Sequence, residues 1–299
     1  MSVRIKCYCC KGETGNVVFR GLTSVYSDQP WDLAECSICK NIITLPVPTG
    51  ELLNKIYSDT YLYSIHLVVL NEKKFRSLWM AKFVRNISVE KNYNSILEVG
   101  CMFGYLLDEL KNNFNVKGIE IGEDAVSFCQ NTGLDVKNIS IENYLLQDDE
   151  KFDLIILSHV FEHLLTPEII LSQLSNRLKS GGKLIISVPN SNSFNRKLFG
   201  RNWGWWQVPV HINHFQKSAL EKITCNAEMK IEKVRYKGGD SLMLLLNLIN
   251  FFGFRNKKSN LSFLKKSIIK LFTFLFRYWY FIGNEEITVV MVKKKFNYI

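Results

Sequence analysis

A short apolar run that ends in a glycine turn constrains this chain more than any other feature of its sequence. Residues 96–104 read ILEVGCMFG, in which Gly100 and Gly104 close the run and a helical pattern begins at once. Glycine is needed where the backbone turns sharply and approaches a ligand closely. A second apolar run, at residues 116–121, brings the carboxylate of Glu120 to about 20 residues after the turn, where an acid binds ribose hydroxyls. The stretch therefore predicts a strand, a tight turn and a helix that bind a nucleoside-containing cofactor.

The turn lacks the third glycine of G-x-G-x-x-G, which allows a helix to approach a bound pyrophosphate, so a cofactor without phosphates suits it better. Four stretches resemble, in chain order, the landmarks of class I S-adenosylmethionine-dependent methyltransferases: LEVGCMFG (97–104), GIEIG (118–122), FDLIILSHVFEHL (152–164) and GGKLIISVPN (181–190). A fifth, VHINHF (210–215), is similar to a subgroup that acts on nucleotide sugars and polysaccharide components. The resemblance implies S-adenosylmethionine as the cofactor. It departs from the family at Met102, where glycine or another small residue is usual.

Apolar β segments alternate with helical patterns through most of the chain. Strands are expected at residues 95–99, 116–120, 135–137, 152–158, 183–188, 231–236 and 287–292. Such alternation predicts an α/β fold with a doubly wound, mostly parallel sheet, which binds its ligands at the carboxyl ends of the strands. The resemblance implies a seven-stranded, Rossmann-like sheet that ends in an antiparallel pair.

The resemblance also implies roles for nine residues around the cofactor. They are Glu98, Gly100, Cys101 and Gly104 at the turn, Glu120 on the ribose, Ser140 and Ile141 beside the adenine, and Ser158 and His159 in the cleft. The family usually has an acid where Ser140 stands, and the alternative for Glu120 is a solvated acid at a strand end. His159 and His163 are four residues apart, which on a helix also suits a metal. The resemblance instead favours packing or hydrogen bonding of His163 beneath the cofactor.

Two further histidines, His211 and His214, follow an aromatic cluster formed by Trp203, Trp205 and Trp206. A histidine with a pKa near neutrality is the natural general base for a sugar hydroxyl. The resemblance to the sugar-modifying subgroup implies that this stretch faces the acceptor, so each histidine is a candidate catalytic base or substrate-orienting residue. The tryptophans either stack on a sugar ring or form a packed lid.

The N-terminal region carries two C-x-x-C pairs, Cys7 with Cys10 and Cys36 with Cys39. Four thiolates surround zinc tetrahedrally, and a gap of two residues lets each pair hold one metal ion. Cys9 is an alternative to either member of the first pair. Disulfides are the other interpretation, which a reducing compartment disfavours. The pairs predict a structural zinc site, because four thiolates leave no open coordination position.

A chain of 299 residues is long enough for one sizeable core and an accessory module. The predicted organisation is a zinc ribbon at residues 1–45, a helical linker or cap at 46–90, a cofactor-binding domain at 91–240 and 284–299, and a basic amphipathic helical insert at 241–283. The sequence has no apolar signal core and no run of the ~18 apolar residues that a spanning helix needs. A cytoplasmic protein is the expectation.

The insert concentrates the positive charge of the chain. Residues 241–284 contain no Asp or Glu but seven Lys and Arg, and removing these seven from the net charge of +10 leaves +3. A nucleic-acid binder would spread its basic charge over the fold, so nucleic acid is the least favoured partner. A basic amphipathic helix within 242–282 favours either peripheral contact with the inner face of an anionic membrane or packing, as a homo-oligomer surface or as a lid over the substrate.

These features together indicate a methyltransferase that acts on a small-molecule or glycan acceptor. The favoured reaction is O-methylation of a sugar hydroxyl in polysaccharide or nucleotide-sugar biosynthesis, with C- and N-methylation as alternatives. A rival hypothesis is RNA or protein methylation, although no N-P-P-Y-type motif follows the fourth strand. A second rival is a degenerate scaffold that binds the cofactor without catalysis.

Overall fold

A computed structural model describes residues 5–24, 26–27, 29–57, 70–89, 91–147, 149–239, 241–251 and 284–294. The chain divides into two compact units. The first contains Met1–Gly50, Val188–Lys222 and Val234–Thr288, and the second contains Glu51–Ser187, Ile223–Lys233 and Val289–Ile299. The four-part organisation expected from the sequence stays a prediction.

Seven strands form one sheet in the order β10-β11-β8-β7-β4-β5-β6. Their bounds are β4 Ser95–Val99, β5 Asn115–Glu120, β6 Val136–Asn138, β7 Phe152–Ser158, β8 Leu178–Pro189, β10 Met229–Lys237 and β11 Glu286–Lys293. β4 pairs in parallel with β5 and β7, β5 with β6, and β7 with β8. The central strands read as nearly continuous apolar runs because helices cover both faces of the sheet. The predicted fold class, a doubly wound and mostly parallel sheet, is confirmed.

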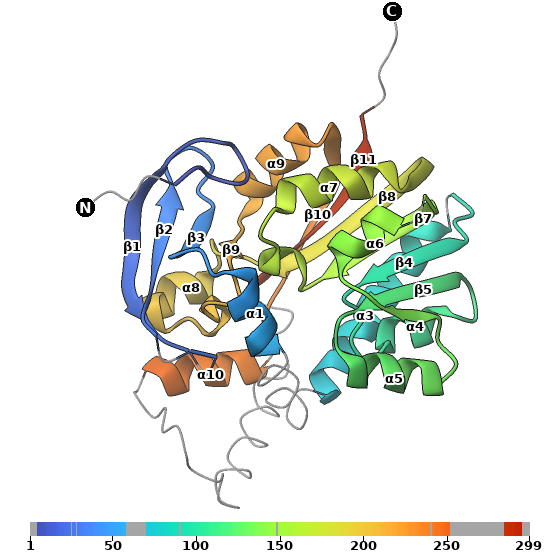
Figure 1. Cartoon of the computed structure of the whole chain (residues 1–299), viewed down its shortest axis with the longest axis horizontal. Coiled ribbons are helices and arrows are strands. Elements are labelled where there is room, and N and C mark those ends of the chain that lie inside the picture. The colour runs from blue at the N-terminus through green and yellow to red at the C-terminus, as the bar shows by residue number, and fades with distance from the viewer. Residues whose placement is uncertain are drawn as a thin grey trace, which may run out of the picture. The chain divides into compact units, whose positions relative to one another are not determined.

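Several α-helices precede or connect these strands. They are α1 Gly50–Ile56, α3 Leu70–Ser88, α4 Tyr105–Leu110, α5 Glu123–Asn131, α6 Ile141–Gln147 and α7 Pro167–Asn176. In Figure 1, α3, α4 and α5 gather on one side of the strands, and α6 and α7 on the other. An apolar face of α3 packs into the core, where Trp79 stacks on Phe83 with ring centroids 5.6 Å apart.

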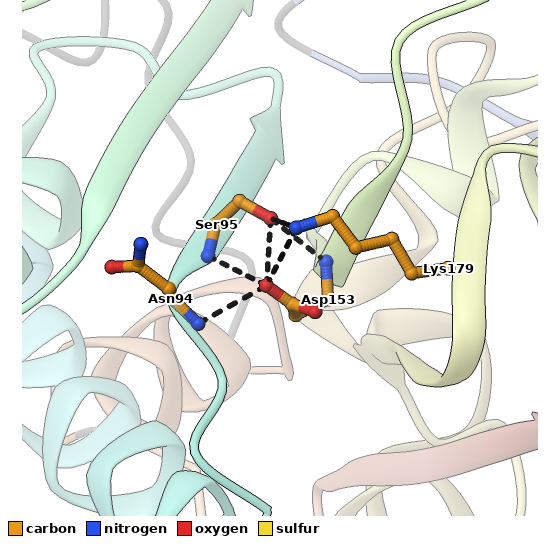
Figure 2. Close-up of polar contacts among 4 residues, drawn as sticks. All are labelled: Asn94, Ser95, Asp153 and Lys179. Carbon is orange, nitrogen blue, oxygen red and sulfur yellow. Dashed lines mark hydrogen bonds and ion pairs between the residues drawn. The ribbon is translucent and has the colours of Figure 1, made fainter.

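A polar network closes the amino-terminal edge of β4, β7 and β8 (Figure 2). Oδ2 of Asp153 accepts hydrogen bonds from the backbone N–H groups of Asn94 and Ser95, at 3.1 and 2.9 Å, and from Ser95 Oγ at 2.8 Å. Lys179 Nζ lies 3.0 Å from the same oxygen. Burial raises the pKa of Asp153, but these donors outweigh it and lower the pKa to about 2. The carboxylate therefore joins three strand starts.

The first unit contains a separate four-stranded sheet in the order β1-β2-β3-β9. Its strands are β1 Thr14–Leu22, β2 Trp31–Cys36, β3 Ile42–Leu45 and β9 Asn213–His214, and all its pairs are antiparallel. The short strands β3 and β9 were not predicted. Through β9, the stretch that carries His211 and His214 joins the sheet of the N-terminal cysteine region.

The remaining described elements are short helices. They are the 3₁₀ turns η2 Phe161–His163, η3 Gly200–Asn202 and η4 Gly204–Trp206, and the α-helices α8 Phe194–Phe199, α9 Lys217–Asn226 and α10 Ser241–Phe251. Most of the predicted basic insert, residues 252–283, lies outside the described residues, and so does its expected amphipathic helix. Within the described parts of the chain, every helix is too short or too polar to cross a membrane.

Candidate functional site

The predicted glycine turn follows β4 and leads directly into α4. Gly100 and Gly104 have φ angles of 68° and 67°, which side-chain-bearing residues rarely adopt. A Cβ at Gly100 would collide with the side chain of Val160, and one at Gly104 would lie 2.5 Å from Leu134 Cδ1. The glycines are therefore required by both conformation and space.

Glu120, the last residue of β5, binds the turn through its carboxylate. Its Oε2 accepts a hydrogen bond from Met102 N at 2.9 Å, and its Oε1 accepts from Ile121 N and Gly122 N at 2.8 and 2.9 Å. A carboxylate has about four acceptor positions, so these three bonds leave capacity at Oε2. The acid stands directly beside the turn, as the spacing predicts, while its contact with a ribose stays a prediction.

Met102 lies inside the turn with a φ angle of 48°. A residue with a side chain is disfavoured in this left-handed region, which explains why the resembling family usually has glycine here. The Met102 backbone is held on both sides, because its N–H donates to Glu120 and its carbonyl accepts from Cys129 Sγ at 3.2 Å.

Glu98 is a buried acid on β4, two residues before the turn. Burial raises its pKa well above the ordinary value, and the nearby Cys129 and Glu120 raise it further. Its Oε2 has no hydrogen-bond partner among the described residues. Both effects favour the protonated form of Glu98. The thiol of Cys101 is also buried, and its hydrogen bond with Cys129 raises its pKa, which disfavours the reactive thiolate.

The two residues expected beside the adenine lie where α6 begins. Ser140 Oγ accepts a hydrogen bond from Asn143 N at 3.3 Å, and its carbonyl accepts from Tyr144 N at 2.9 Å. This is the pattern of a helix N-cap, for which serine is a preferred residue. Ile141 is buried. The cap explains why a serine occupies this position, and adenine contact stays a prediction for both residues.

Ser158 ends β7 and His159 follows it with a φ angle of 57°. Arg76 Nη1 lies 3.3 Å from His159 Nε2, and Glu162 Oε1 lies 3.4 Å from His159 Nδ1. Arginine only donates, so Nε2 is the acceptor in this contact and a neutral His159 carries its proton on Nδ1. Sequence reasoning did not anticipate Arg76, which comes from a helix before the glycine turn.

His163 has a partner from another N-terminal helix. Its Nδ1 lies 3.0 Å from the hydroxyl of Tyr57, and the two rings meet edge to face with centroids 6.3 Å apart. This hydrogen bond agrees with the packed role that the resemblance implies for His163.

The four predicted metal ligands come together in the first unit. The Sγ atoms of Cys7, Cys10, Cys36 and Cys39 all lie within 4.8 Å of one another, and Cys7–Cys39 and Cys10–Cys36 are each 3.4 Å apart. Tetrahedral zinc with Zn–S bonds of about 2.3 Å places its sulfurs about 3.8 Å apart, which these separations bracket. Cys9 is buried beside the cluster, and all these cysteines are free thiols.

The two cysteine turns have the same backbone geometry. Lys11 N donates to Cys7 O at 2.9 Å, and Lys40 N donates to Cys36 O at 3.1 Å. Both lysines have positive φ angles, of 60° and 65°. The shared C-x-x-C-K sequence was a signal for this repeat that sequence reasoning did not use. Two equivalent turns that face each other with four thiols fit a four-thiolate metal site.

The tautomers of His211 and His214 follow from their partners. His211 Nδ1 lies 2.8 Å from the carbonyl of Trp205, which only accepts, so Nδ1 carries the proton and Nε2 the lone pair. Thr44 Oγ1 donates its one proton to His211 O at 2.6 Å, so it accepts from His214 Nε2, 3.0 Å away. Neutral His214 therefore carries its proton on Nε2. Both histidines are buried.

The tryptophans are packed around this pair. Trp206 meets the ring of His214 edge to face at 4.9 Å, and Trp203 meets Trp206 at 4.8 Å. Trp203 Nε1 donates to Glu285 Oε2 at 2.9 Å, and burial raises the pKa of Glu285 to about 7. Of the two roles expected for the tryptophans, the packed one accounts for these contacts.

Residues 72–234 match a protein family described as "Methyltransferase domain", over more than half of the chain. This chain belongs to the methyltransferase domain family. Together with the sheet order, the family identifies residues 72–234 as a class I S-adenosylmethionine-dependent methyltransferase domain.

Known proteins similar to this methyltransferase have low sequence identity to it. The ubiquinone biosynthesis O-methyltransferase of Hydrogenovibrio crunogenus is 29% identical over 118 residues, which are 37% of this chain and 48% of that protein. The protein of the same name from Glaesserella parasuis is 28% identical over 135 residues, which are 41% and 57%. The chain thus spans about half the length of these curated relatives.

A solved structure gives the same fold at lower identity. The crystal structure of a SAM dependent methyltransferase from Archaeoglobus fulgidus has a TM-score of 0.51 and 20% identity, and the match covers 75% of this chain and 98% of that one. This likeness concerns the fold of the methyltransferase.

Proposed function

We propose that this methyltransferase transfers the methyl group of S-adenosylmethionine to a hydroxyl of a small-molecule or glycan acceptor. The observation that supports this most is the hydrogen bond between Met102 N and Glu120, which joins the glycine turn to the acid of the next strand. This pair combines a close backbone approach with a ribose acceptor, the two features that a nucleoside cofactor needs.

In this proposal the cofactor residues divide by the part of the cofactor they bind. Gly100, Cys101 and Gly104 hold the amino-acid part, and Glu98 orients the turn or the ammonium group. Glu120 accepts from the ribose, Ser140 and Ile141 border the adenine, and Ser158 and His159 line the cleft. Transfer from a positively charged sulfur is an in-line displacement, so these residues act mainly by alignment.

The proposed catalytic base is His211, with His214 as the supporting histidine. A base needs a lone pair, and the hydrogen bond from Nδ1 to Trp205 O leaves that lone pair on Nε2. His214 instead donates the proton on its Nε2 to Thr44 Oγ1 in a hydrogen bond. His211 Nε2 would accept the acceptor's hydroxyl proton, and bound S-adenosylmethionine would supply the methyl group.

Two acceptor classes have separate support. The resemblance of residues 210–215 to sugar-modifying enzymes favours a sugar hydroxyl in a nucleotide sugar or polysaccharide component. The names of the curated relatives favour the hydroxyl of a quinone precursor. Incubation with methyl-labelled S-adenosylmethionine and either nucleoside diphosphate sugars or catechols separates them. Label found only on the catechol rejects the sugar acceptor. Label found only on RNA or protein rejects both small-molecule acceptor classes.

Cofactor binding is tested by calorimetry with S-adenosylmethionine. Glu120→Ala is expected to weaken binding at least about 100-fold, because it removes a carboxylate that also holds the turn. Glu221→Ala, which removes an exposed acid of α9, is the matched control and leaves affinity unchanged. Tight binding by Glu120→Ala contradicts the pocket assignment, and absence of binding by the wild-type protein supports the scaffold hypothesis.

The four cysteines are proposed to hold one structural zinc ion. Metal analysis of the purified protein should give one zinc per chain, and Cys39→Ser should lose it. Cys225→Ser is the control, because Cys225 is exposed and outside the cluster. A metal-free wild-type protein that retains its fold contradicts this assignment.

Three roles are proposed as alternatives for the insert at residues 241–283. We favour a packed or self-associating segment over peripheral membrane contact, and nucleic acid is the least favoured. Sedimentation with anionic and neutral vesicles distinguishes them, since a basic interfacial helix binds only the anionic ones.

A further inference from the structure

Hydrogen bonds connect the second cysteine turn, at residues 36–39, with the histidine stretch, at residues 211–214. The chain leaves Cys39 and within three residues enters β3, which pairs with β9. The register places Ile42 opposite His214 and Ile43 opposite Asn213. A strand of only two residues has little stability of its own, so β9 depends on β3 for its conformation.

Side chains from beyond β9 also bind the cysteine turn itself. Ser218 Oγ donates to Cys39 O at 2.7 Å, and Gln216 Nε2 donates to Lys40 O at 3.0 Å. Asn41 Nδ2 donates to Asn213 Oδ1 at 3.2 Å, while Asn41 O accepts from Cys36 N at 2.8 Å. The carbonyls of the metal-binding turn thus serve as anchors for the histidine stretch.

Thr44 connects this framework to the backbone of His211 and to the imidazole of His214. Its side chain is fully buried, and Oγ1 both donates to His211 O and accepts from His214 Nε2. Its backbone N–H donates to Ile212 O at 2.9 Å. One residue of β3 therefore binds the backbone carbonyls of His211 and Ile212 and sets the tautomer of the His214 ring. A buried hydroxyl with both its donor and acceptor positions used is costly to replace.

We propose that Thr44 is a positioning residue through which a thiolate-bound divalent cation at the cysteine cluster orders His211 and His214. The metal fixes the turn of Cys36 and Cys39, the turn fixes β3, and Thr44 holds the backbone of His211 and the ring of His214. This proposal rests on the function proposed above for His211. Metal loss then disorders the acceptor side of the enzyme, while the cofactor turn belongs to the other unit and keeps its affinity.

The first test compares Thr44→Val with Thr44→Ser in the full chain. Val keeps the shape of threonine but removes the hydroxyl, and Ser retains the hydroxyl. Ring ¹⁵N spectra of the histidines report which nitrogen is protonated. Thr44→Val should convert His214 from its single Nε2-protonated form to a mixture, with zinc content and cofactor affinity unchanged. Thr44→Ser should restore the wild-type spectrum.

An unchanged His214 spectrum in Thr44→Val overturns the proposal, and so does failure of Thr44→Ser to restore it. If Thr44→Val does not fold, Ser218→Ala provides the second variant, because it removes only the bond to Cys39 O. Ser218→Ala should raise amide exchange at Thr44 with zinc retained. Unchanged exchange in that variant overturns the proposed connection.

The second test removes the metal from the wild-type protein with a chelator. Amide exchange at Thr44 should rise at least about tenfold, as expected when a local hydrogen-bonded structure opens more readily. Re-addition of zinc should reverse this rise, and Cys225→Ser should behave like wild type. Unaltered exchange after complete zinc loss overturns the role of the metal. Neither test needs an acceptor or turnover, so a wrong acceptor class and a wrong positioning role give different results.

Discussion

Asp153 and Glu98 are acids on the neighbouring parallel strands β7 and β4, at opposite edges of the sheet. Asp153 lies at the amino-terminal edge, where backbone N–H groups, a serine and a lysine donate to it and lower its pKa to about 2 (Figure 2). Glu98 lies beside the glycine turn, where burial and neighbouring acidic groups raise its pKa. Hydrogen bonds stabilise the ionised acid at one edge, and burial disfavours ionisation of the acid at the other.

This difference indicates that the amino-terminal edge of the sheet contributes to stability and that the opposite edge carries the candidate site. A carboxylate with complete hydrogen bonding stabilises the fold above its pKa. A buried acid without a partner carries a cost that a bound cation can relieve. The functional edge also holds Met102 and His159 with positive φ angles, and such strain concentrates at ligand sites. The predictions below test each side of this contrast.

The largest effect is expected at the functional edge, for Gly100→Ala. The new Cβ would meet Val160 and force a side chain into φ 68°, so we expect a loss above about 3 kcal/mol in unfolding free energy and no cofactor binding. Gly133→Ala is the matched control in the same unit, because it has φ 76° and no neighbour within 4 Å of the new Cβ. It should cost about 1 kcal/mol. Equal losses of unfolding free energy in the two variants, measured by urea titration, would show that the contact with Val160 does not contribute to the effect.

The second effect concerns Glu98→Gln and the pH dependence of stability. The folded-state pKa of Glu98 is raised, so its contribution is complete below the unfolded-state pKa near 4.5 and is lost as pH rises towards the folded-state pKa. This loss has a slope of about 1.4 kcal/mol per pH unit. Glutamine resembles the neutral acid and removes the slope.

Because of Glu285, the free energy of unfolding of Glu98→Gln must be compared with that of wild type at each pH. Burial raises its pKa to about 7, so it adds its own loss of stability between about pH 4.5 and 7 in both proteins. The free energy of unfolding of Glu98→Gln minus that of wild type should therefore increase from pH 5 to pH 7. A constant difference would mean that Glu98 is ionised in the folded protein.

Asp153→Asn tests the amino-terminal edge and should cost roughly 2 kcal/mol at pH 7, which corresponds to the lowered pKa. The sign is opposite to that of Glu98. The stabilisation is present above the unfolded-state pKa near 3.8 and disappears as pH falls towards 2. Asp149→Asn is the control, since Asp149 is fully exposed. Cofactor affinity should not change, and a large change would contradict the division between the edges.

Much of the second unit was predictable because its signals are local. The strands of the sheet are continuous apolar runs, and Gly100, Gly104 and Glu120 occur at spacings that only a strand–turn–helix unit explains. The side-chain contacts of Glu120 were not predictable, because its partners are backbone groups. Arg76 was missed for another reason: its helix precedes the sheet, and no pattern in the sequence connects it with His159.

The first unit was harder to predict because its organisation is nonlocal. The C-x-x-C pairs predicted the clustering of cysteines, but β9 has two residues and pairs with a strand about 170 residues earlier. No periodicity marks a strand of that length. The contact of Thr44 with His211 and His214 could therefore not be predicted from the sequence, although all three residues are buried.

The smallest effect is expected for Met102→Gly. Glycine relieves the strain of φ 48° but increases the entropy of the unfolded chain, so the net gain in stability should be below about 1 kcal/mol. Glu228→Gly is the control, because Glu228 has φ 56° and lies away from the turn. Both variants should gain similar stability, but only Met102→Gly should bind S-adenosylmethionine more tightly, since it widens the space at the turn. Weaker binding would instead show that the methionine side chain contacts the cofactor, and the departure from the family's glycine would then be an adaptation of the pocket.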